Sequence, residues 1–167
     1  MRPQDVVVLL NLLVLDEKPW RMVDIAQSLG ISQSEVTQAL ERSRVAGLVR
    51  GDKRRVHVKG LFEFLIHGIQ YVFPERPGGL VRGMVTAHSA LPLKGKIVQG
   101  SDPPYVWPFE EGTERGQLIR PLFPSVPSAA KRDKDLYELL ALTDALRVGF
   151  PREKTLAIRE LERRGRL

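Results

Sequence analysis

The 167-residue sequence predicts a mainly α-helical fold with a small β wing. Residues 1–71 and 128–167 space their apolar side chains as amphipathic or buried helices do. Residues 72–127 hold nine prolines and seven glycines, which is too many for long helices. We therefore expect a helical first segment with a β-hairpin near its end, an irregular Pro/Gly-rich middle segment and a C-terminal helical segment.

Composition excludes several functional classes. The chain has no cysteine, which rules out disulfides, thiolate metal sites and cysteine nucleophiles. It has no HExxH, P-loop, GxSxG or dinucleotide fingerprint, so we expect no metal, no cofactor and no enzymatic activity. The apolar run at residues 6–15 is too short to cross a bilayer and is followed by no cleavage signal, which predicts a cytoplasmic protein.

The first segment predicts three helices in succession. Residues 6–15 are apolar nearly all round, as in a buried helix, and residues 22–29 place apolar side chains on one face of a two-turn helix. Gly30 ends that second helix, because glycine tolerates the left-handed conformation of a tight exit. Ser32 and Glu35 form a capping-box pattern, which predicts a third helix over residues 32–46.

The third helix has two unlike sides. Its core side is expected to consist of Val36, Ala39, Leu40 and Ser43. Its opposite side also includes Glu41 and Val45, and it carries short polar and amide side chains that can hydrogen-bond to base edges in a DNA groove. The candidate base-contacting residues are Gln33, Ser34, Thr37 and Gln38.

A basic hairpin is expected directly after the third helix. Residues 48–58, "LVRGDKRRVHV", predict two short strands joined by a turn at Gly51 and Asp52. Residues 42–59 contain seven basic residues and one acidic residue, so this window could account for the whole net charge of +6. Such a run is often only a solvated face, but beside a polar helix it indicates phosphate binding. The candidate phosphate and wing contacts are Ser32, Arg42, Arg44, Arg50, Lys53, Arg54 and Arg55.

Helix, short helix, glycine turn, capped helix and basic hairpin together describe a winged helix-turn-helix. The stretch "MVDIAQSLGISQSEVTQALERSRVAGLVRGDKRRV", within about residues 21–58, resembles the DNA-binding core of MarR-type winged-helix repressors. The resemblance implies a major-groove recognition helix at 32–46 and a wing at 50–58 on the backbone or minor groove. Ser43 departs from the pattern, since such helices usually place a leucine there.

A homodimer is expected, because one recognition helix covers only a few base pairs. Two apolar stripes could pair with their copies or belong to the core. The candidate dimerisation residues are Leu61, Phe62, Leu65 and Ile66 in one stripe, and Leu136, Leu139, Leu140 and Leu146 in the other.

The rest of the chain leaves alternatives open. Residues 72–127 contain aromatic side chains at every second position from Tyr105 through Trp107 to Phe109. This pattern favours an ordered flap that covers the core over a ligand or partner surface. The basic tail after Pro151 could contact phosphates or pack on an acidic partner. Residues 136–157 also weakly resemble small bacterial regulators found beside nucleotidyltransferase-type toxins.

These observations favour a sequence-specific double-stranded-DNA-binding transcriptional regulator, most simply a repressor. RNA is a lesser alternative ligand for the same face. A second class of function is an antitoxin-like module that binds and neutralises a toxin-like partner enzyme and autoregulates its operon.

Overall fold

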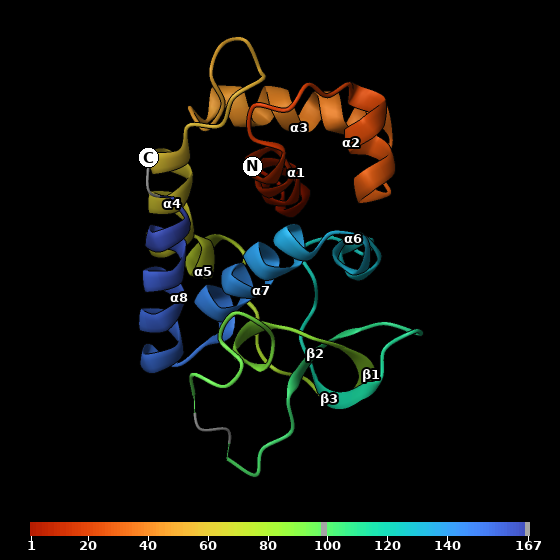
Figure 1. The fold of residues 1–167 in the computed structure, drawn as a ribbon, viewed down its shortest axis with the longest axis vertical. Coiled ribbons are helices and arrows are strands. Elements are labelled where there is room, and N and C mark those ends of the chain that lie inside the picture. Colours follow the sequence, from red (N-terminus) through yellow and green to blue (C-terminus); the bar gives the residue numbers. More distant parts are fainter. Residues whose placement is uncertain (98–99, 166–167) are drawn as a thin grey trace.

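The computed structural model describes residues 1–97 and 100–165 and is mainly helical with a small sheet (Figure 1). The first segment forms α1 (Pro3–Leu15), α2 (Met22–Leu29), α3 (Gln33–Val45), α4 (Val58–His67) and α5 (Ile69–Val72). The middle segment forms β1 (Leu80–Val85), the 3₁₀ turn η1 (Ala87–Ser89), β2 (Tyr105–Pro108) and β3 (Glu114–Leu118). The last segment forms α6 (Val126–Arg132), α7 (Lys134–Val148) and α8 (Pro151–Arg164). Within the described ranges, no helix has the length and apolar character that a membrane crossing requires.

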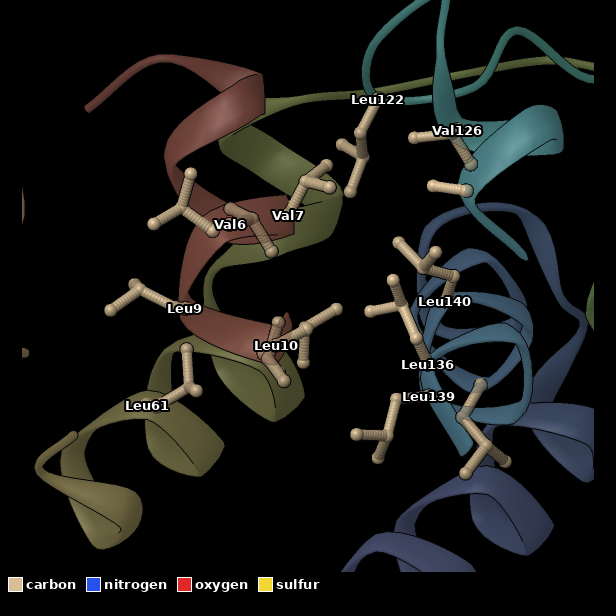
Figure 2. Close-up of a cluster of buried hydrophobic side chains, with 14 of the residues drawn as sticks. Val6, Val7, Leu9, Leu10, Leu61, Leu122, Val126, Leu136, Leu139 and Leu140 are labelled. Atoms are coloured by element: carbon tan, nitrogen blue, oxygen red, sulfur yellow. The ribbon is translucent and has the colours of Figure 1, made fainter. Parts of the chain in front are cut away.

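Helix α7 is the centre of the molecule, since it contacts α1, α4, α5, α6, α8 and η1. Figure 2 shows Val6, Val7 and Leu10 of α1 facing the leucines of α7. Every residue from Leu139 to Arg147 is buried, so this part of α7 is covered by protein on all of its faces. One hydrophobic core therefore runs through all three segments of the chain.

Both candidate dimerisation stripes lie inside this core. Leu61 and Leu65 of α4 are fully buried, Phe62 is nearly so, and Ile66 packs against the same cluster. On α7, Leu136, Leu139, Leu140 and Leu146 are each at most 5% exposed. The assignment of these eight residues to a dimer contact is wrong, because they already pack within one protomer.

The middle segment is more regular than expected. Strand β1 pairs antiparallel with both β2 and β3, and β2 pairs parallel with β3, which closes a three-stranded barrel. Glycine permits this closeness: a Cβ at Gly83 would lie 1.9 Å from the carbonyl oxygen of Trp107, and one at Gly116 would lie 2.1 Å from that of Pro104. The small sheet of the structure is therefore formed by residues 80–118 of the middle segment, and not by the hairpin expected at residues 48–58.

A buried polar group joins this sheet to α7. Asp144 accepts hydrogen bonds from Trp107 Nε1 at 2.6 Å and Thr86 Oγ1 at 2.9 Å, and Arg147 donates to it at 2.7 Å. Arg147 also donates to the backbone carbonyl of Phe73. Because buried polar groups are costly unless paired, these bonds hold the barrel in one position against the central helix.

Candidate nucleic-acid interface

A tight glycine turn joins α2 to α3. Gly30 has φ of 66° and caps α2, and the amide of Ile31 donates to the carbonyl of Ala26 at 3.0 Å. A Cβ at Gly30 would lie 3.3 Å from the Cβ of Ser125, just before α6. The turn therefore requires glycine both for its backbone conformation and for the approach of the C-terminal segment.

The start of α3 differs in one detail from the expected capping box. Ser32 Oγ accepts from the amide of Glu35 at 3.1 Å, as expected for an N-cap. The Glu35 carboxylate, however, accepts from Gln4 at 3.1 Å and from Arg42 at 2.5 Å. The expected hydrogen bond from the Ser32 amide to the Glu35 carboxylate is therefore wrong, because Gln4 and Arg42 donate to this carboxylate instead.

The two sides of α3 are separated as the sequence predicted. Val36, Ala39, Leu40 and Ser43 are fully buried. Gln33, Ser34, Thr37 and Gln38 are exposed. Thr37 Oγ1 donates to the carbonyl of Gln33 at 3.0 Å, and Gln38 Nε2 donates to Ser34 Oγ at 3.3 Å. These contacts at the surface orient the face and leave acceptor and donor capacity toward solvent.

Arg42 is not available to phosphates. Its guanidinium donates to both carboxylate oxygens of Asp5, at 2.7 to 3.1 Å, and to Glu35. Asp5 is fully buried in α1, so Arg42 neutralises a charge that has no access to water. The hydrogen bond from Arg42 also lowers the pKa of the Glu35 carboxyl below its usual value. We therefore correct its expected role from phosphate contact to a link between α1 and α3.

The hairpin after α3 has only one bridged residue pair, Val49 with Val56. Inside it, the amide of Arg50 donates to the carbonyl of Arg55 at 2.9 Å, and the amide of Lys53 donates to the carbonyl of Arg50 at 2.8 Å. Lys53 has φ of 56° at the end of this turn. The two expected strands thus reduce to a minimal ladder, whose tip extends beside α3 at one end of the molecule (Figure 1).

One carboxylate connects this tip to α3. Glu41 accepts from Arg44 at 2.6 Å and from Lys53 at 2.7 Å. These two bonds, the one from Arg44 first, lower the pKa of Glu41 to about 2. The carboxylate is therefore ionised under all ordinary conditions, and it offsets part of the positive charge of Arg44 and Lys53.

Arg54 has a second structural role that the sequence did not reveal. Its guanidinium lies 4.3 Å from the centre of the Trp20 ring and donates to the Trp20 carbonyl at 2.7 Å. Trp20 lies between α1 and α2 and is nearly buried. The stacking and the hydrogen bond together hold the hairpin against the α1–α2 connection.

The remaining hairpin cations are less constrained. Arg55 makes a single 3.4 Å contact with Asp52, and within the described ranges no ion pair is found for Arg50 or Lys59. Apart from Arg42, the cations from residue 44 to residue 59 number six, with Glu41 and Asp52 as the carboxylates paired with them. This end of the molecule therefore keeps a positive charge after its internal pairs are counted.

The sequence did not reveal the role of Trp20, and Glu41, which was expected on the groove-facing side of the third helix, is paired with Arg44 and Lys53. Its spacing of three residues from Arg44 on the same helix could have indicated that ion pair, but not the one with Lys53. No signal in the sequence could have paired Trp20 with Arg54. Within the described ranges, no cluster of metal-ligating side chains occurs. Comparisons with protein-family models, curated proteins and solved structures find no match to the chain.

Proposed function

We propose that the chain is a sequence-specific, double-stranded-DNA-binding transcriptional regulator of the winged helix-turn-helix kind, acting as a repressor. The proposal rests on one observation: four exposed, uncharged hydrogen-bonding side chains in the first half of α3 lie on the same helix as Glu41, which is paired with Lys53 of an exposed cationic hairpin. In this proposal α3 lies in the major groove and the hairpin lies on the adjacent backbone.

The chemistry of the α3 face supports base recognition. A glutamine amide can pair with the N6 and N7 edge of adenine, and serine and threonine hydroxyls can donate to or accept from several base edges. Val45, which is 74% exposed at the end of the same helix, can contact a thymine methyl group.

The charges of the hairpin support backbone contact. Ion pairs at the surface contribute little to stability, so Arg55 and Lys53 can exchange Asp52 and Glu41 for phosphates at small cost. Arg50 needs no such exchange. Phosphate contacts position a protein on DNA without selecting a sequence, which leaves selection to α3.

Gln38→Ala is expected to weaken binding to the best operator by about 1–3 kcal/mol and to change binding to random DNA much less. The substitution removes a base contact and no charge. Val36→Ala, on the buried side of the same helix, should instead lower the free energy of unfolding by about 2 kcal/mol. Competition binding on both DNAs and thermal melts of both variants measure these effects. A Gln38→Ala protein that is destabilised yet keeps its operator preference would contradict the assigned orientation of α3.

Binding as a two-fold dimer is part of the proposal, with half-sites about 34–36 Å apart or a multiple of that spacing. Sedimentation of the protein, alone and with operator DNA, is expected to give two protomers per operator. A single protomer bound per duplex at micromolar concentration would refute the dimer. It would leave the assignment of α3 untouched.

A further inference from the structure

The exposed side of α3 carries a carboxylate at its middle, that of Glu41. Glu41 lies one turn after Thr37 and Gln38 and one turn before Arg44 and Val45. Residues at these spacings share one face of a helix. The side chain of Glu41 is 44% exposed. Any DNA that α3 contacts through Thr37 and Gln38 therefore meets this carboxylate as well.

Two cations neutralise the Glu41 carboxylate. Arg44 donates to it twice, from Nη2 to Oε1 at 2.6 Å and from Nε to Oε2 at 3.1 Å. Lys53 adds a contact from Nζ to Oε2 at 2.7 Å. The bonds from Arg44 and then from Lys53 lower the pKa of Glu41 to about 2, so at ordinary pH the carboxylate only accepts hydrogen bonds. An isolated carboxylate would be repelled by phosphates, whereas this one reaches DNA as part of an ion pair.

The two cations differ in how they hold Glu41. Arg44 lies on the same helix, and its planar guanidinium fixes both carboxylate oxygens. Lys53 comes from the hairpin, whose tip extends beside α3 (Figure 1), and its exposed ion pair can be exchanged for a phosphate at small cost. That exchange returns an acceptor site to Oε2 while Arg44 keeps the carboxylate in place. Binding of the hairpin to DNA thus leaves an oriented acceptor at the centre of the α3 face.

We propose that Glu41 is a further base-reading residue of α3, which accepts a hydrogen bond from the N4 amino group of a cytosine in the major groove. Cytosine and adenine both present an amino donor there, but adenine also presents the N7 acceptor, which opposes a carboxylate. Arg44 is a positioning residue for Glu41 and not a phosphate contact. The inference rests on the proposed DNA-binding function and adds a base to the sequence that α3 selects.

The test selects duplexes from a pool with a randomised central segment, using the full chain and its Glu41→Gln variant. The wild type is expected to enrich cytosine at one position close to the base that depends on Gln38. Glu41→Gln should change that preference to adenine, because a glutamine amide can pair with N6 and N7 of adenine. On two duplexes that differ only at this base pair, the ratio of affinities should change by about tenfold.

The ratio separates base reading from the general effect of charge. Removing a carboxylate near DNA raises affinity for all duplexes alike, which leaves the ratio unchanged. Glu63→Gln, at an exposed position of α4, removes the same charge outside α3 and should not alter the ratio. Arg44→Lys keeps the charge and loses the two-bond geometry, so it should weaken the cytosine preference. The melting temperature of Glu41→Gln should stay near that of the wild type, because both ion pairs are exposed.

Two results would overturn the role of Glu41 and leave the proposed function standing. An equal gain of affinity on both duplexes would make Glu41 a charge that weakens phosphate binding. An unchanged cytosine preference in Glu41→Gln would show that another group reads this base. If the wild type enriched no sequence from the pool, the proposed function would itself fail, and the inference with it.

Discussion

Arg42→Ala is expected to lower the free energy of unfolding by about 3–5 kcal/mol, because it leaves the carboxylate of Asp5 buried without its charge partner. Asp5 would keep only the bond from the amide of Arg2, at 2.7 Å. Denaturant unfolding followed by circular dichroism measures the loss. The expected loss of stability is large because the Asp5 carboxylate remains buried without a partner, and not because an ion pair by itself contributes much stability.

Two controls separate this role from a phosphate contact. Arg44→Ala removes an arginine from the same helix whose ion pair with Glu41 is exposed, and should leave the free energy of unfolding nearly unchanged. Asp5→Asn combined with Arg42→Ala should recover part of the loss, since no buried charge remains. If Arg42→Ala matched Arg44→Ala in stability and lost DNA affinity instead, the structural role of Arg42 would be wrong.

The sequence predicted local features of the fold well. The end of α1 and the boundaries of α2 and α3 follow from apolar spacing, from Gly30 and from the Ser32 cap, whereas α1 begins at Pro3, before the apolar run. The separation of α3 into a buried and an exposed side follows from the same periodicity. These are short-range effects, and one sequence contains all the information they need.

The errors concern contacts between distant residues. The leucine stripe of α7 has the spacing of a dimer contact, and only the packing of α1 and α4 against it shows that the stripe is internal. The barrel pairs β1 with strands more than twenty residues away, at positions where glycine permits contact. Likewise, the partners of Arg42 and Arg54 lie 37 and 34 residues away, so the basic window could not be divided into structural and free cations beforehand.

The arginines of the hairpin differ in how strongly they are held by other residues of the chain. Arg54 is bound to Trp20, whereas Arg50 and Arg55 are exposed and weakly constrained. Replacing Arg54 would therefore disturb the position of the hairpin as well as its charge. A variant that neutralises only Arg50 and Arg55 changes charge alone.

Arg50→Gln with Arg55→Gln is expected to reduce affinity for all DNA sequences by the same factor. Each phosphate contact contributes a slope of about −0.9 to the dependence of log affinity on log salt, so two lost contacts reduce the steepness by about 1.8. Relative to a 1 M reference, this corresponds to about a sixtyfold loss of affinity at 0.1 M salt. Fluorescence anisotropy on operator and random duplexes over a range of salt concentrations measures both quantities.

The matched comparison is Arg54→Gln. This substitution removes the stacking on Trp20 and the hydrogen bond to the Trp20 carbonyl, so it should lower the melting temperature. The Arg50/Arg55 double variant should have the melting temperature of the wild type. A double variant with an unchanged salt slope would show that the hairpin does not touch phosphates. A slope change of about 0.9 for Arg54→Gln, without any loss of stability, would instead place Arg54 on a phosphate of the DNA.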